Sequence, residues 1–119
     1  MNYLEKIYNE NKVQDLIEFL KEYVDSRLEY SIRFCADHED YALLTIKKDG
    51  STIARIELTS FDCKLIHVIK DEEKFISNLF GMIRLAYLSF LSVNYSEYQN
   101  KYLAYMARLT VEVLNNELS

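Results

Sequence analysis

The chain has 119 residues, of which half are apolar and 28% are charged, and its formal net charge is −5. This length and composition predict a single globular domain over residues 1–119 with its own core, and they exclude a disordered chain. Because no basic stripe offsets the negative charge, we do not expect direct binding to nucleic acid, whose affinity comes largely from neutralised phosphates.

The chain has no proline and two glycines, a composition that predicts long regular elements joined by short turns. The N-terminal residues lack an apolar stretch, and Cys35 and Cys63 lack the spacing of a redox or metal pair. The most apolar window, residues 79–93, is shorter than the roughly 20 residues of a membrane span. We therefore expect a soluble cytoplasmic protein that makes no membrane contact.

An amphipathic helix is predicted over residues 12–28, after a shorter helical patch at residues 3–8. Asn11 and Gln14 are predicted to form a capping pair at its start. Its apolar positions recur every three or four residues: Val13, Leu16, Ile17, Leu20, Val24 and Leu28. The opposite face is an acidic surface that is solvated by default: Asp15, Glu18, Glu22 and Asp25.

The hydrophobic period then changes to two, which predicts an antiparallel sheet with one packed and one solvated face. Asp49-Gly50 between two alternating runs is a strong signal for a hairpin turn. In the strand after this turn, Ala54 is expected on one face and Ile53 on the other. The four predicted strands form a meander and cover residues 30–36, 41–48, 52–58 and 63–69.

A helix that begins at the acidic residues 71–73 is apolar on nearly every face up to residue 93. Such a helix is expected to be buried on all sides, and a subunit interface would supply part of the cover. Arg84 lies in the middle of it and needs a carboxylate partner. We favour an internal salt bridge, with Glu57 or an acid of the first long helix as the candidate, over a role for Arg84 at an interface.

The last predicted helix, residues 95–118, carries a stripe of tyrosines spaced three and four residues apart. A tyrosine ring is an apolar body with a polar tip, so the stripe is the main candidate for an interface. It has three interpretations: packing within this chain's own core, the seam of a homodimer, and a surface for a foreign protein. The tyrosines are Tyr95, Tyr98, Tyr102 and Tyr105.

The chain carries no motif of a known catalytic, phosphate-binding or metal site. One histidine and three carboxylates stand together in residues 37–40, but consecutive turn residues cannot all converge on one ion, so we expect a solvated turn. Cys63 and His67 would lie roughly 13 Å apart along a strand, too far for a nucleophile and its base. We therefore expect no enzyme activity, no cofactor and no metal.

These observations predict an α+β domain: an N-terminal helix, a four-stranded antiparallel meander, and two C-terminal helices packed on one face of the sheet. The leading functional hypothesis is a small acidic cytoplasmic protein that binds another protein and blocks or escorts it by surface contact. In size and make-up, and not in motif, the chain resembles phage-encoded inhibitors of host defence nucleases, such as anti-CRISPR proteins, and immunity proteins that plug toxin active sites. The expected partner is thus another protein, such as a nuclease or another nucleic-acid-processing enzyme.

Two alternatives come from other functional classes. The first is a dimeric acidic chaperone, which would bind extended client segments through apolar surface. The second is an enzyme whose residues carry no recognisable motif, which would need a concave pocket with perturbed titratable groups.

Overall fold

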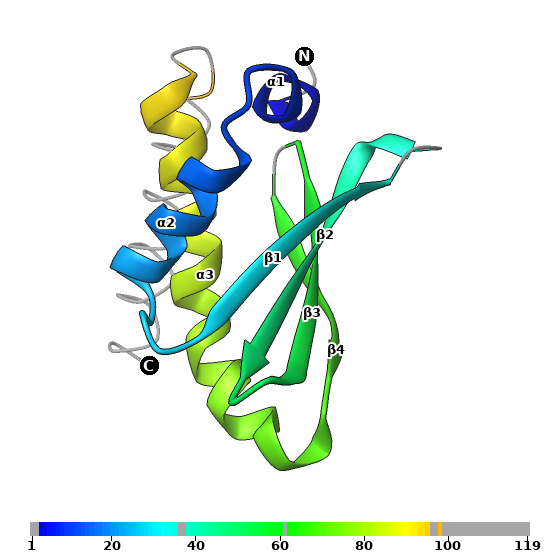
Figure 1. Ribbon diagram of the computed structural model, residues 1–119, viewed down its shortest axis with the longest axis vertical. Helices are drawn as coiled ribbons and strands as arrows, with labels where there is room; N and C mark the ends of the chain where they lie inside the picture. Colours follow the sequence, from blue (N-terminus) through cyan, green and yellow to red (C-terminus); the bar gives the residue numbers. More distant parts are fainter. Residues whose placement is uncertain (1–2, 36–37, 61, 96–97, 99–119) are drawn as a thin grey trace, which may run out of the picture.

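The computed structural model describes residues 3–35, 38–60, 62–95 and 98, and these residues form a sheet with helices on one face (Figure 1). This arrangement agrees with the predicted α+β class. The second C-terminal helix, residues 95–118, lies outside the described residues apart from Tyr95 and Tyr98. The elements in chain order are α1 (Tyr3–Asn9), α2 (Val13–Tyr23), β1 (Glu29–Cys35), β2 (His38–Lys48), β3 (Ser51–Thr59), β4 (Cys63–Val68), the 3-10 turn η1 (Lys70–Glu72) and α3 (Glu73–Asn94).

The sheet is an antiparallel meander with strand order β1-β2-β3-β4, as predicted. β2 begins at His38 and not at Tyr41, so His38–Asp40 belong to the strand and not to the predicted turn. At the other end of β2, Asp49 (φ 52°) and Gly50 (φ 81°) both adopt positive φ. Two positive φ angles are what a type I′ hairpin turn requires, which confirms the hairpin.

One face of the sheet is buried under the helices. Ala42, Leu44 and Ile46 of β2 are fully buried. Ile53 was expected on the face opposite to Ala54, yet both residues are buried. The pairing of β2 and β3 shifts register and leaves Ile53 as an extra residue between Thr52 and Ala54. A bulge of this kind changes which face the following side chains occupy, so Ile53 and Ala54 both enter the core.

The predicted helix 12–28 is shorter at its C-terminal end, because α2 stops at Tyr23. The chain then turns where Asp25 accepts hydrogen bonds from the backbone N–H and the guanidinium of Arg27. Asn11 does not cap α2 and instead ends α1 with a positive φ of 59°. The N–H groups of Asn11 and Lys12 donate to the carbonyls of Tyr8 and Ile7, a Schellman ending that a left-handed residue allows.

Helix α3 packs one face against the sheet and α2, and the Tyr87 hydroxyl donates a hydrogen bond to the carbonyl of Thr59. The segment Lys70–Asn94 is long and apolar enough, by length and composition, to cross a membrane. In this fold seven residues of α3 are buried in the core. Contrary to prediction, α3 is not buried on all sides, since Met82 and Val93 are 45% and 77% exposed.

Candidate functional site

Two tyrosines of the predicted stripe belong to this chain's own core. Tyr95 and Tyr98 are 4% and 2% exposed. Both pack on Tyr3 of α1, with ring centroids 5.5 Å apart for Tyr95 and 5.3 Å apart for Tyr98, the latter edge to face. The fold thus favours the core interpretation for these two residues and leaves them little surface for a partner. Tyr102 and Tyr105 lie outside the described residues.

Burial perturbs the pKa of one phenol at the described end of the stripe, Tyr98. Desolvation raises the pKa of Tyr98 far above its ordinary range, and nearby carboxylate charge at Asp62 adds to the effect. The Tyr98 ring is therefore a neutral packing group and not an acid–base group near neutral pH.

Arg84 forms an ion pair within the chain, but its partner is neither Glu57 nor an acid of the first long helix. Its Nε donates to Asp62 Oδ1 at 2.8 Å, and a terminal nitrogen donates to Asp62 Oδ2 at 2.7 Å. The Arg84 and Asp62 side chains are 34% and 44% exposed. The pair links α3 to the β3–β4 turn at the surface, so Arg84 is not the buried cation that the apolar sequence around it suggests.

The predicted acidic surface is smaller than expected. Asp15, Glu18 and Glu22 are exposed on α2. Asp25 lies beyond the end of α2, and its carboxylate is engaged by Arg27, whose side chain lowers the pKa of Asp25 to about 2. The acidic stripe, defined from here as Asp15, Glu18 and Glu22, therefore excludes Asp25.

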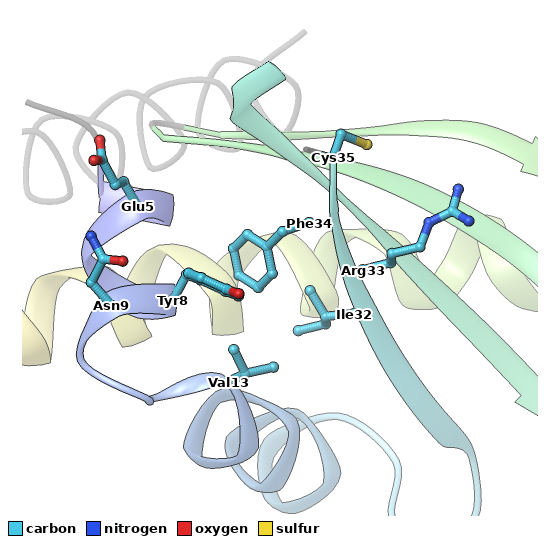
Figure 2. A pocket seen from close by; sticks show the side chains of 8 residues that line it. All are labelled: Glu5, Tyr8, Asn9, Val13, Ile32, Arg33, Phe34 and Cys35. Atoms are coloured by element: carbon cyan, nitrogen blue, oxygen red, sulfur yellow. The ribbon is translucent and has the colours of Figure 1, made fainter. Parts of the chain in front are cut away.

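A cleft lies between α1 and the edge strand β1 (Figure 2). Its volume is about 490 Å³, within the range of ligand pockets. Figure 2 shows side chains of α1, the start of α2 and β1 around the same space. The lining residues are Glu5, Tyr8, Asn9, Val13, Ile32, Arg33, Phe34 and Cys35. We call this hollow the α1–β1 cleft.

An aromatic pair forms the apolar wall of the α1–β1 cleft. The rings of Tyr8 and Phe34 lie 5.1 Å apart at an interplanar angle of 57°. Tyr8 nevertheless stays 62% exposed, because α1 ends just after it and the chain turns at Asn11 into α2. Ile32 and Val13 complete this wall. An exposed tyrosine fixed against a second ring is typical of an interface anchor.

Arg33 and Cys35 bring polar side chains to the β1 side of the cleft. Arg33 points away from the aromatic pair on the other side of β1 (Figure 2) and is exposed. Cys35 is half-buried, and its hydrogen bond to Tyr41 raises the pKa of that phenol. Among the residues that the structure describes, no three His, Cys, Asp or Glu side chains gather to hold a metal ion.

A second apolar hollow lies between α2 and α3. It includes Phe19 and Tyr23 of α2, whose rings are 4.4 Å apart, and the exposed Met82 and Val93 of α3. The acidic stripe of α2 runs beside Phe19 and Tyr23 in the helical repeat. This α2–α3 patch is the exposed side of the helix that the sequence predicts to be buried all round.

Comparison with protein-family models, with curated proteins and with solved structures finds no match for this chain.

The α1–β1 cleft is absent from the predicted sites. Its residues come from three elements, α1, α2 and β1. Each residue fits the hydrophobic pattern of its own helix or strand, so no single segment indicates a shared site. The alternation of residues 30–36 indicates a strand but not that this strand lies at the edge of the sheet. One signal in the sequence points to this cleft. Tyr8 places an aromatic side chain at the end of a short helical patch, directly before the polar residues 9–12.

Proposed function

We propose that this chain is a cytoplasmic protein-binding protein that acts by surface contact without catalysis, and that it holds a segment of its partner in the α1–β1 cleft. The observation that carries the proposal is the Tyr8–Phe34 pair, which leaves a largely exposed aromatic ring over an apolar hollow. An exposed apolar patch of this kind lowers the solubility of a protein unless a binding partner covers it, so such patches often mark binding sites.

The proposal retains the class expected from the sequence, an inhibitor of the anti-CRISPR or toxin-immunity kind. The exposed acidic stripe supports a partner with a basic surface, such as a nuclease or another nucleic-acid-processing enzyme. Complementary charge speeds association and excludes wrong partners, while buried aromatic anchors supply most of the affinity. In this proposal the α1–β1 cleft supplies most of the affinity, and the acidic stripe increases the rate of association with a basic partner.

The test is a selection of peptides from a random phage-displayed library against the folded full-length protein. Selected peptides are then titrated calorimetrically against two variants, Tyr8→Ala and Tyr23→Ala. Tyr23 is a matched control, because it is 57% exposed on α2 and lies outside the cleft. Thermal unfolding followed by circular dichroism checks that both variants fold.

We expect Tyr8→Ala to weaken binding about tenfold or more, as for an aromatic hot spot, and Tyr23→Ala to leave it unchanged. The proposal is overturned if no peptide is enriched, or if the enriched peptides depend on Tyr23 and not on Tyr8.

A dimeric chaperone is the second candidate, and the α2–α3 patch favours it, because a second exposed apolar surface would help to hold an unfolded client. The same selection separates the two functions. An inhibitor should select peptides that share one consensus sequence, and a single substitution such as Tyr8→Ala should abolish their binding. A chaperone should enrich many unrelated apolar sequences and tolerate such a change.

A further inference from the structure

The α1–β1 cleft runs along the free edge of β1 and not over one face of the sheet. Four consecutive strand residues line it, Ile32 to Cys35. Successive side chains of a strand point to opposite faces, and Figure 2 shows Ile32 and Phe34 on one side of β1 with Arg33 on the other. A hollow that contacts side chains on both sides of β1 must pass along the edge of this strand, where the backbone N–H and C=O groups of β1 lie.

This edge is unpaired within the described part of the chain. β1 stands first in the strand order and pairs with β2 alone among the described strands. No described residue outside β2 exchanges a backbone hydrogen bond with Ile32 or Phe34. An open strand edge is a template for a further strand.

The turn at Asp49-Gly50 shows which backbone groups point outward. In a two-residue hairpin the flanking residues, Lys48 and Ser51, exchange hydrogen bonds, so the backbone of Lys48 points to β3. The backbone N–H and C=O groups of successive residues in a strand point alternately to its two neighbouring strands. Leu43 lies an odd number of positions from Lys48, so its backbone groups point to β1 and bond those of its partner Arg33. The N–H and C=O groups of Ile32 and Phe34 consequently face the cleft.

We propose that the cleft takes an extended segment of the partner protein, which adds to β1 as a fifth strand. The inference rests on the proposed function and names the form of the ligand. Main-chain hydrogen bonds to Ile32 and Phe34 would hold the segment, and its alternate side chains would contact the walls of the cleft. Inward side chains meet Tyr8 and Phe34 and should be apolar.

The outward side chains of the added strand lie beside Arg33. Arg33 is exposed and forms no ion pair with any described residue. Opposite charges on neighbouring strands stabilise the pair, so an acidic residue is expected there. The fitting ligand is a segment that alternates apolar residues with polar ones and carries an Asp or Glu next to Arg33.

Charge also favours a foreign segment over a second copy of this chain. Symmetric antiparallel pairing of two β1 strands over Ile32–Cys35 would place both Arg33 side chains on one face, opposite or nearly opposite each other. Like charges in that position destabilise a strand pair.

The test is an N-methyl scan of a synthetic peptide chosen by the selection described above. Each backbone N–H of the peptide is replaced in turn by N-methyl, and binding to the full-length protein is measured. A strand on β1 predicts that alternate positions lose about tenfold or more in affinity and that the positions between them change by less than about twofold. A scan without this period of two overturns the inference, while dependence on Tyr8 would still support the proposed function.

Arg33→Glu supplies the second readout, with Arg55→Glu as its control. Arg55 is exposed on β3 and lies outside the α1–β1 cleft. Affinity for an acidic peptide should fall about two- to fivefold in Arg33→Glu and stay constant in Arg55→Glu. Equal effects in the two variants contradict the place given to the acidic residue. A dimer in sedimentation that the peptide dissociates would assign the edge to a second copy instead.

Discussion

Gly50 and Gly81 show how the same residue type has opposite effects at two positions. Gly50 has a φ of +81°, whereas Gly81 lies within α3, and an added Cβ meets no atom within 4 Å at either position. Steric clashes with the surroundings are therefore excluded at both sites, and only the backbone conformation differs. A left-handed φ disfavours alanine, while a helix interior favours it.

We predict that Gly50→Ala lowers the free energy of unfolding by about 1 kcal/mol, and that Gly81→Ala raises it by about 0.5–1 kcal/mol. Urea unfolding of the two variants beside the wild type measures both effects. Equal shifts of the same sign would contradict the type I′ turn assigned to Asp49-Gly50.

Asp25 gives a pH dependence whose sign is fixed by its bond to Arg27. The hydrogen bond from the Arg27 side chain lowers the pKa of Asp25 from 3.8 to about 2. A carboxyl with a lowered folded-state pKa contributes stability above its unfolded pKa and loses it as the pH falls toward the folded value.

Stability of the wild type should therefore decline between about pH 4 and about pH 2 more steeply than that of Asp25→Asn, which cannot titrate. Urea unfolding at several pH values in this window provides the measurement. Parallel curves for the two proteins would show that Asp25 is not held by Arg27 in solution.

Ile53 marks the limit of sequence analysis for single residues. The alternation in residues 52–58 correctly groups Ala54, Ile56 and Leu58 on one face, which is buried. It assigns Ile53 to the opposite face, although Ile53 is buried as well. A bulge adds one residue to one strand and leaves the sequence pattern of its neighbours intact. Its position depends on pairing with β2, which the sequence of β3 alone does not contain.

At the scale of elements, the Arg84–Asp62 pair tests the contact between α3 and the β3–β4 turn. The bonds are bidentate, but both side chains are about one-third or more exposed, and such pairs contribute little. Asp62 also accepts a bond from the N–H of Cys63, so its removal disturbs the turn as well.

A double-mutant cycle with Arg84→Met and Asp62→Asn separates these terms. We predict a coupling of about 0.2–1 kcal/mol and unchanged peptide binding in Arg84→Met. A coupling above about 3 kcal/mol would contradict the half-exposed pair and indicate a buried one. Loss of peptide binding would restore Arg84 as an interface residue.

The elements follow from local patterns more closely than their ends do. The period of two and the Asp49-Gly50 signal predict the meander, the spacing of three and four residues predicts α2, and the long apolar run after the acidic residues 71–73 predicts α3. The end of α2 at Tyr23 was missed, because Val24 and Leu28 continue the helical spacing. The hydrogen bonds from Arg27 to Asp25 stabilise a turn where the predicted helix would continue. The spacing of apolar residues gives no information about such polar contacts.

At the scale of the whole molecule, the candidate site depends on which elements become neighbours. The α1–β1 cleft combines Tyr8 with Phe34, residues from opposite ends of the N-terminal third of the chain. Neither stands out in its own segment, whereas the conspicuous Tyr95 and Tyr98 are hidden against Tyr3. The sequence indicates which side chains could anchor a partner, but tertiary packing decides which of them remain exposed.

The central claim is that the partner segment pairs with the free edge of β1. Amide hydrogen exchange, followed residue by residue by NMR with and without a selected peptide, tests it most directly. The N–H groups of Ile32 and Phe34 should exchange markedly more slowly when the peptide is bound, while the N–H of Arg33, already bonded to β2, should change little. Unchanged exchange at Ile32 and Phe34 under saturating peptide would contradict the claim.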